Sequence, residues 1–392
     1  MDALLEREYP GLETLYRELH AEPELSLGEK KTSERMAREL KAIGLEVSSG
    51  IGGFGVVGVL RNGPAPVVLV RADMDALPVT EQTGLPYASR NGAMHACGHD
   101  VHMTCLVGAA RLLNQSKEKW KGTLIFIAQP AEEKGQGAQS MLEAGLYTRF
   151  PKPNFALALH VDSQLSAGAL GYASGPAFAN VDSVDLVISG KGGHGAYPHL
   201  CVDPIVIAAE ILLAYQTIVS RELRPYETAV VTAGSIHGGT KHNIIPSEVK
   251  LEFTVRSYTE EVRSQILDSM KRIASDIARA HRAPRAPELR VTESIPSTYN
   301  DPQLVERLVP VFEKLLGGER VVRKDPEMGG EDFGLFGRAG VPAFLFRVGS
   351  VPAGKKPWLS LHSSEYAPDL KPTVVTGIRA MTASVLELCR KP

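Results

Sequence analysis

The sequence is poor in cysteine and has no excess charge of either sign. Its 392 residues include four cysteines, at positions 97, 105, 201 and 389, and no Cys-x-x-Cys pair. Such spacing does not outline a disulfide framework. The 43 basic and 45 acidic residues give a formal net charge of −2, which offers no overall attraction for nucleic acid or an anionic membrane. We therefore expect a small-molecule partner.

Long hydrophobic runs are also missing. No apolar run reaches the roughly 18 residues that would suggest a membrane span, and residues 1–8 lack a basic region followed by an apolar stretch. With cysteines that have no disulfide pattern, these features predict a cytoplasmic protein. A chain of 392 residues exceeds what one hydrophobic core normally serves, so two domains are expected.

Buried-strand patterns recur before residue 160 and again near the carboxyl end. The apolar runs lie at residues 66–72, 123–128, 155–159 and 343–348, and each ends in polar or acidic side chains. Helical spacing at residues 101–113 follows Asp100, which could cap the start of that helix. This alternation predicts an α/β layer with a mainly parallel sheet, whose ligand sites belong at the carboxyl ends of the strands.

From about residue 180 the predicted order changes to β-α-β-β-α-β. The segments are strand 183–189, helix 203–220, strands 227–236 and 248–257, helix 260–280 and strand 288–295. This is the split βαβ, ferredoxin-like α+β arrangement, small enough to be inserted between two parts of a larger domain. The predicted boundaries are 1–178 and 297–392 for the two parts of the larger, catalytic domain and 179–296 for the insertion.

Residues 95–103 hold three histidines, a cysteine and a carboxylate, a density that packing alone does not explain. Thiolate and imidazole suit Zn²⁺ and its neighbours, and Gly98 lets the backbone bend so that Cys97 and His99 can face one centre. Structural zinc sites usually close with paired cysteines, so this segment favours an open, hydrolytic metal site. We interpret His102 as a helix residue and His95 as a support of the loop.

Two adjacent carboxylates, Glu132 and Glu133, follow a buried strand. An unpaired charge there would be costly unless it met a cation. Because adjacent side chains normally point apart, one could bind a metal while the other reaches an attacking water. The alternative is a solvated glutamate pair at the start of a helix.

Two separate histidines complete the candidate ligands. His160 ends a buried strand, and His362 lies in a loop-like segment. Each alone would be read as a hydrogen-bonded structural residue, but the strand assignment places both at the same sheet edge as the cysteine and glutamate candidates. Five ligands exceed what one tetrahedral zinc takes, so two divalent metals sharing a water are inferred. Zn²⁺, Mn²⁺, Co²⁺ and Ni²⁺ all suit these ligands.

Eight short motifs follow one another along the chain. They are RADMDALP at 71–78, MHACGHDVHM at 94–103, QPAEE at 129–133, ALH at 158–160, GKGGHGAYPH at 190–199, HNIIP at 242–246, MGGEDF at 328–333 and LHSSEY at 361–366. Together they resemble the aminoacylase/carboxypeptidase superfamily of metallohydrolases, and most of all its branch of hippurate hydrolases, N-acetyl-amino-acid deacetylases and plant auxin-conjugate amidohydrolases. Their order along the chain makes the match far more specific than any single motif.

The resemblance implies roles for individual residues of the catalytic domain. The pair of divalent metals would be bound by Cys97, His99, Glu133, His160 and His362, with Glu132 as general base. This branch has the cysteine where a bridging aspartate is usual, and whether it bridges both metals is left open. Asp73 and Asp75 would orient imidazole ligands, or alternatively bind turn amides.

The resemblance also implies a lid and dimerisation role for the insertion, in a homodimer or homotetramer. His194 would reach the partner subunit's active site and stabilise the oxyanion; the alternative is a flexible hairpin with an incidental histidine. Asn243 is a candidate for substrate contact, or a turn residue before a strand. Arg256 or Lys241 could bind a substrate carboxylate, and no local motif selects between them.

The expected reaction is metal-dependent hydrolysis of the amide bond of an N-acyl-L-amino acid. Glu132 would take a proton from the attacking water and return it to the leaving amine, while the metals act as Lewis acids. A dipeptidase or carboxypeptidase is the nearest alternative, since it also cleaves an amide beside a free carboxylate. A metal-stabilised binding protein and a cysteine hydrolase using Cys97 are further alternatives, and chelation would separate the latter from a metallohydrolase.

Overall fold

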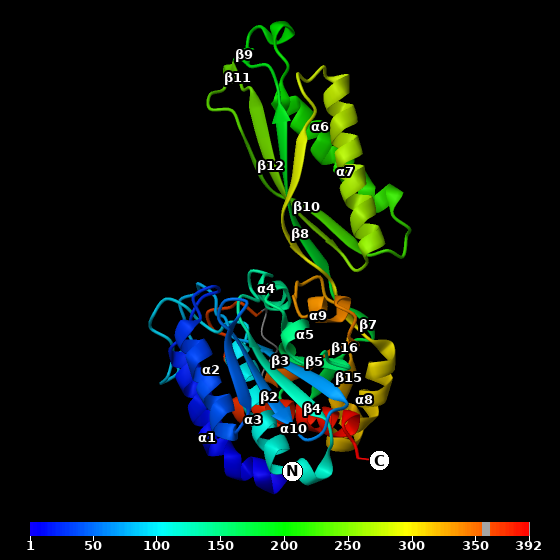
Figure 1. Cartoon of the computed structure of the whole chain (residues 1–392). Coiled ribbons are helices and arrows are strands. Elements are labelled where there is room, and N and C mark those ends of the chain that lie inside the picture. The colour runs from blue at the N-terminus through cyan, green and yellow to red at the C-terminus, as the bar shows by residue number, and fades with distance from the viewer. Residues whose placement is uncertain (355–360, 392) are drawn as a thin grey trace. The chain divides into compact units, whose positions relative to one another are not determined.

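The computed structural model describes residues 1–354 and 361–391 as an α/β protein whose chain divides into two units (Figure 1). The larger unit consists of Met1–Ala177, Thr298–Pro326 and Glu331–Pro392, and the smaller of Phe178–Ser297 and Glu327–Gly330. The chain therefore leaves the larger unit and returns to it twice, and the short segment Glu327–Gly330 belongs with the smaller one.

An eight-stranded sheet forms the centre of the larger unit. In spatial order its strands are β1 (Glu46–Ile51), β2 (Gly55–Arg61), β4 (Thr123–Gln129), β3 (Val67–Asp73), β5 (Phe155–Ser166), β16 (Ala343–Val351), β6 (Leu170–Tyr172) and β15 (Val321–Arg323). The central four, β4-β3-β5-β16, are parallel neighbours. The pairs β1-β2, β2-β4 and β16-β6 are antiparallel, and β15 runs parallel to β6. Every residue of β3 and β4 is buried, and burial on both faces of the sheet explains why these strands are continuous apolar runs in the sequence. The predicted α/β class with a mainly parallel sheet is confirmed.

Helices cover this sheet and complete its core. The longer ones are α1 (Asp2–Ala21), α2 (Lys30–Ile43), α3 (His99–Gln115), α8 (Pro302–Leu316) and α10 (Leu370–Leu388), and the shorter ones α4 (Gly137–Glu143), α5 (Leu146–Arg149) and α9 (Gly334–Arg338). Helix α3 packs against β3, α1 and α10, and almost all of its side chains are buried. It is therefore a core helix, held in place on several sides.

The start of α3 differs from the sequence prediction. The helix begins at His99 rather than after Asp100, with Gly98 as the preceding residue in a left-handed conformation (φ 76°). Asp100 lies in the first turn, and its carboxylate accepts a hydrogen bond from the amide of Val101. The prediction erred because a capping aspartate and a first-turn aspartate give the same sequence signal.

The smaller unit has the element order β-α-β-β-α-β. Its elements are β8 (Asn180–Ser189), α6 (Pro204–Thr217), β10 (Ala229–Gly238), β12 (Glu248–Ser257), α7 (Glu260–Ala280) and β13 (Glu288–Ile295). The antiparallel sheet has the spatial order β10-β12-β8-β13, and α6 and α7 lie side by side over one face (Figure 1). Two short strands, β9 (Gly193–His194) and β11 (Ile244–Ile245), pair with each other in a separate two-stranded sheet. A second two-stranded sheet consists of β7 (Gly175–Phe178) and β14 (Thr298–Asn300).

Helix α6 is apolar on more than the face that meets the core. Ile207, Ile211 and Tyr215 are buried in the core of the smaller unit, whereas Val206 and Leu213 are exposed. Together with the following turn, Pro204–Glu222 has the length and hydropathy of a membrane span, although a third of its most apolar window is buried. A core helix passes the same test, so this segment by itself does not indicate a membrane protein.

Candidate metal centre and active site

The candidate site begins where parallel strands of the central sheet end. Asp73, the last residue of β3, is in register with Gln129, the last residue of β4. On the other side of β3, Arg71 is opposite Ala158 of β5, so His160 lies level with Asp73 two residues further along. Strand register thus brings side chains from three segments of the chain to one edge, as expected for an open parallel sheet.

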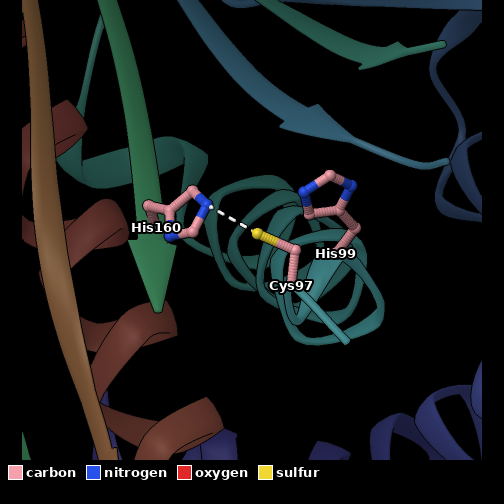
Figure 2. Close-up of side chains that lie close together, drawn as sticks. All are labelled: Cys97, His99 and His160. Atoms are coloured by element: carbon pink, nitrogen blue, oxygen red, sulfur yellow. Dashed lines mark hydrogen bonds between the residues drawn. The ribbon is translucent and has the colours of Figure 1, made fainter. Parts of the chain in front are cut away.

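Cys97 and His99 approach this edge from the loop before α3 and from the first residue of that helix. Cys97 Sγ lies 3.5 Å from His160 Nε2, and Figure 2 shows the thiol lying between the two imidazole rings. The backbone at Gly98 permits this arrangement, because a Cβ there would lie 2.6 Å from Cγ2 of Val161. One ligand atom each of Cys97, His99 and His160 lies within 4.8 Å of the other two, so one metal ion could bind all three.

Glu133 and His362 add a second group next to the first. His362 Nε2 lies 3.6 Å from Glu133 Oε1, and together with Cys97 Sγ these atoms lie within 4.8 Å of one another. The same Glu133 oxygen is 3.8 Å from Nε2 of His99. The side chain of His362 is 53% exposed, so this part of the site is open on one side. The structure therefore brings all five predicted ligand residues together in two groups that share the cysteine.

Buried carboxylates hold two of the imidazoles. Asp75 Oδ1 lies 3.3 Å from His99 Nδ1, which leaves Nε2 of that ring toward the cysteine and glutamates. Asp73 Oδ1 lies 2.6 Å from His102 Nδ1, and the other ring nitrogen of His102 accepts the amide of Val161 at 2.9 Å. Both nitrogens of His102 are thus engaged, in agreement with its interpretation as a helix residue. Carboxylates that fix ring orientation in this way are common around metal sites.

His95 was expected to support the loop. It is buried, and neither ring nitrogen has a hydrogen-bond partner among residues 1–354 and 361–391. Burial lowers the pKa of His95 to about 4, so the ring is neutral. Among the residues that the structure describes, no hydrogen bond of the ring holds the loop.

Buried titratable groups of the site have shifted pKa values. Burial lowers the pKa of His99, but the charge of Asp73 and the hydrogen bonds of Asp75 and Cys97 outweigh it and raise that pKa well above its usual value. Burial raises the pKa of Glu133 to about 7 and raises that of the Cys97 thiol well above its usual range. For Glu132 the pKa is also raised well above its usual value, by burial and then by the nearby charges of Glu331, Glu133 and Asp332. A cation in this space would reverse these shifts, since metal binding stabilises thiolate and carboxylate.

The donor atoms fit a pair of divalent metal ions. Sulfur, imidazole nitrogen and carboxylate oxygen suit Zn²⁺, Mn²⁺, Co²⁺ or Ni²⁺. The buried Oε1 of Glu133 has no hydrogen-bond partner among the described residues, as expected of an atom reserved for a metal. Burial lowers the pKa of His160 well below its usual value, which keeps its ring neutral, the form that binds metals.

A neighbouring group of acidic residues has a cation of its own. Glu132, Glu331 and Asp332 place carboxylate oxygens within 4.8 Å of one another. The fully buried guanidinium of Arg71 bonds to Glu331 at 2.8 Å, to Asp332 at 3.0 Å and to Asp73 at 2.7 Å. Arg71 therefore compensates Glu331 and Asp332, whereas no Lys or Arg contact accompanies Glu132 or Glu133 among the described residues. This difference favours the Cys/His/Glu groups as the metal site.

Sequence reasoning missed this arginine network. Glu331 and Asp332 belong to the motif MGGEDF, to which no role was assigned, and they lie 260 and 261 residues from Arg71 along the chain. One signal was available: an arginine inside an apolar strand must find buried partners. The identity of those partners could not be read from the local pattern.

His194 and Asn243, from two separate motifs, meet in the smaller unit. Strands β9 and β11 pair antiparallel with His194 opposite Ile244, and the amide of Gly195 donates to the carbonyl of Asn243 at 2.9 Å. The amide of Ala196 donates to Nδ1 of His194 at 3.0 Å, so in the neutral ring Nε2 carries the hydrogen. His194 is exposed and presents a donor, the group that an oxyanion needs.

The two candidates for a substrate carboxylate differ in their surroundings. Arg256 on β12 donates to the carbonyl of Met328 at 2.5 Å, and its side chain is half-buried. Lys241 is exposed in the turn before β11. Arg256 is thus partly committed to a backbone contact, and geometry does not select between the two.

The fold and the site together define an α/β hydrolytic enzyme, as predicted. The chain matches peptidase family M20/M25/M40 over residues 69–386, and it belongs to that family. The match includes the motifs of residues 71–78, 94–103, 129–133 and 361–366. The predicted resemblance to this group of hydrolases is confirmed.

Named relatives are found in several organisms. A thermostable carboxypeptidase of Saccharolobus solfataricus is 37% identical over 90% of this chain and 89% of its own length. The N-acetylcysteine deacetylase of Bacillus subtilis is 36% identical over 85% of this chain and 87% of its own length. Among solved structures, a Bacillus subtilis protein described as a dinuclear metal binding peptidase of the M20 family has a TM-score of 0.83 and 32% identity, covering 99% of both chains.

Proposed function

We propose that this chain is a metal-dependent amidohydrolase that cleaves the amide bond of N-acyl-L-amino acids. The observation that carries the proposal is the convergence of Cys, His and Glu donor atoms next to Glu132, where no Lys or Arg contact accompanies Glu133 among the described residues. Its N-acetylcysteine deacetylase relative supports the substrate class. Its solved relative described as dinuclear metal binding supports a pair of ions.

The metal ligands we propose are Cys97, His99, Glu133, His160 and His362. When bound there, two divalent ions would supply Lewis acidity that polarises the amide carbonyl and lowers the pKa of water. The chain's part is to hold the imidazole, thiol and carboxylate groups in fixed orientation. Asp75 serves this purpose by its contact with His99.

Glu132 acts as the general base in this proposal. Its carboxylate oxygen lies 4.0 Å from Nε2 of His99 and is therefore close to the ligand atoms. The Glu132 side chain is 9% exposed. It accepts a proton from the attacking water while the water oxygen bonds to the acyl carbon. It then gives that proton to the nitrogen as the carbon–nitrogen bond breaks, which yields a carboxylic acid and an amino acid.

His194 and Asn243 are proposed to contact the substrate from the smaller unit. The hydrogen bond from Ala196 to Nδ1 of His194 fixes the tautomer in which Nε2 is a donor. Such a donor would stabilise negative charge on the carbonyl oxygen. Asn243 is held beside this histidine by the paired strands β9 and β11.

We further propose that the smaller unit serves as a lid and dimerisation domain. Its surface carries exposed large apolar side chains, which include Leu200, Ile205, Val206, Leu213, Ile236 and Ile244. Strand β10 is an edge strand whose carboxyl half is exposed, so it is available to pair with another strand. A homodimer would bury this apolar surface and let His194 serve the partner's site, and a tetramer built from such dimers is compatible with it.

A metallopeptidase is the second candidate, because a carboxypeptidase relative is as similar as the deacetylase. Both reactions hydrolyse an amide beside a free carboxylate, so one site could serve either. They differ in whether the acyl side carries a free amine. The preference therefore depends on the pocket around the acyl group.

Hydrolysis of a small panel separates these candidates. N-acetyl-methionine, hippurate and an unblocked dipeptide are assayed after chelation and again after addition of Mn²⁺, Co²⁺ or Zn²⁺. We expect the acylated substrates to be cleaved only when metal is restored. Cleavage of the dipeptide alone would assign the chain to the peptidases, activity that survives chelation would favour Cys97 chemistry, and no cleavage with any metal would contradict the proposal.

A further inference from the structure

The turn that carries Glu132 and Glu133 has a strained backbone. Ala131, the residue before them, has a φ of 51° although it is not glycine, and it is buried. Its carbonyl accepts hydrogen bonds from the amides of Gln136 and Gly137, both at 3.1 Å. A non-glycine residue in this conformation persists only where its surroundings determine it, and such positions cluster at functional sites.

The amide of Ala131 is held by a side chain from a distant part of the sequence. Oε1 of Glu29 accepts this amide at 2.7 Å, and the two residues are 102 positions apart. Glu29 has no solvent exposure, and its second oxygen has no partner among residues 1–354 and 361–391. A fully buried carboxyl group is costly, so its presence here needs a reason beyond packing.

The amide of Glu133, which lies within the pair, is also held by a buried side chain. Oδ2 of Asp75 accepts the amide of Glu133 at 2.9 Å and the hydroxyl of Ser26 at 2.7 Å. Ser26 and Glu29 belong to residues 24–29, which we call the clamp segment. The carbonyl of Glu24 in this segment accepts the amide of Ala76 at 2.8 Å.

We infer that Glu29 is a positioning residue that fixes the backbone turn through the Ala131 amide and thereby aims Glu132 and Glu133. The clamp segment holds one amide directly and the other through Asp75, so the two carboxylates leave the turn in set directions. Leu27 in the clamp segment also has a positive φ, 68°, so strained backbone occurs on both sides of this contact. The part of this inference that concerns turnover rests on the proposed function.

Two substitutions separate the hydrogen bond from the volume of the side chain. Glu29→Gln keeps an oxygen acceptor, whereas Glu29→Met fills the space without one. We expect E29M to lower kcat about 100-fold with KM changed less than about threefold, because a misplacement near 1 Å has that effect on positioned groups. E29Q should stay within about threefold of the wild type in kcat, since the acceptor remains. Glu34→Gln, at an exposed position of α2, is the matched control.

A second measurement does not depend on turnover. Hydrogen exchange of residues 129–137 is followed by mass spectrometry in the metal-free wild type, E29Q and E29M. We expect faster exchange in E29M alone, because only that variant releases the Ala131 amide. If E29M does not fold, Glu29→Asp replaces E29M in both measurements. Its side chain is one methylene shorter, so the carboxylate no longer reaches the Ala131 amide.

The outcomes distinguish this inference from the proposed function. Wild-type kcat and wild-type exchange in E29M, or an equal loss of kcat in E29Q and E29M, would overturn the positioning role. If the wild type cleaves no N-acyl substrate, the proposed function fails. In that case the exchange of the metal-free turn still decides whether Glu29 holds it.

Discussion

The buried carboxylates of this site fall into two sets, which differ in whether an arginine lies beside them. Asp73, Glu331 and Asp332 bond to the guanidinium of Arg71 and need no further cation. Glu132 and Glu133 lie next to that network but have no such bond among the described residues. At the scale of single residues, this difference supports a structural role for the first three and the proposed roles of Glu133 at a metal and Glu132 at the attacking water.

Replacing Glu132 by glutamine should abolish most turnover and leave metal binding intact. The amide has the same shape but cannot accept the proton of the attacking water, so we expect kcat to fall about 10²- to 10⁴-fold. Metal content is measured by mass spectrometry on the same samples, with E34Q as control. Full turnover in a metal-loaded E132Q enzyme would rule out this residue as the base.

The two buried cysteines of this region should respond differently to removal of the thiol. Cys97 lies within 4.8 Å of the other candidate ligand atoms, whereas Cys105 faces the carbonyl of Val374 at 3.7 Å. Loss of a residue that only orients a metal ligand typically weakens metal binding by roughly 10–100-fold. We expect Cys97→Ala, which removes a proposed ligand, to weaken metal binding more than this. Cys105→Ala is the matched control, and equal metal affinity in both variants would contradict the assignment.

At the scale of elements, α1 and α3 are joined by a buried ionic contact. His20 near the end of α1 contacts Asp100 of α3 at 2.7 Å and Glu81 at 3.0 Å. Burial lowers the pKa of this histidine, but the hydrogen bond and charge of Asp100, together with Glu81, outweigh it and raise the pKa to about 9. The ring is therefore protonated at neutral pH and links the first turn of the helix that carries His99 to α1.

This contact predicts a specific dependence of stability on pH. Because the folded-state pKa of about 9 exceeds the unfolded value near 6.5, the protonated ring stabilises the fold fully below pH 6.5. As pH rises through 9, about 3 kcal/mol of stability should be lost. The difference in unfolding free energy between the wild type and His20→Gln should shrink by that amount between pH 6 and pH 9.5.

Denaturant unfolding of the larger unit, followed at several pH values, provides the measurement. Glu81, Asp100, Tyr16 and Tyr87 are the polar groups around the ring, so the comparison with H20Q isolates the histidine from their titration. A difference that stays constant over this pH range would show that His20 is neutral in the fold.

At the scale of the whole molecule, the proposed active site takes residues from two chains. His194 lies in the smaller unit, and in our proposal it serves the partner subunit. A variant that lacks Glu132 and another that lacks His194 would then each be inactive alone but would complement one another in a mixed dimer.

Mixing E132Q with His194→Ala tests this directly. A mixed dimer has one complete site, formed by the wild-type Glu132 of one chain and the wild-type His194 of the other. Random exchange of subunits should restore about a quarter of the wild-type activity. No recovery, in mixtures shown by light scattering to contain dimers, would place His194 in its own subunit's site or outside catalysis.

Leu213→Glu, on the exposed apolar surface, should prevent dimerisation and recovery, whereas Val322→Glu in the larger unit should not.

The sequence by itself determined part of the secondary structure and the side-chain chemistry of the candidate site. Helix α7 and strands β12 and β13 have the bounds that were predicted for them, because alternation, helical spacing and the capping Thr259 are local signals. The dense Cys/His segment and the motifs in order were enough to name the family, since metal ligands are chemically distinctive side chains.

Only the tertiary structure decided which buried groups meet. Arg71 and Glu331 are 260 residues apart, and Glu29 and Ala131 are 102 apart. Nothing in the local pattern of either partner specifies the other, because such contacts depend on how strands and loops cross in space. The sequence predicts that a buried charge needs a partner, but the fold selects the partner and so decides which glutamates remain available to a metal.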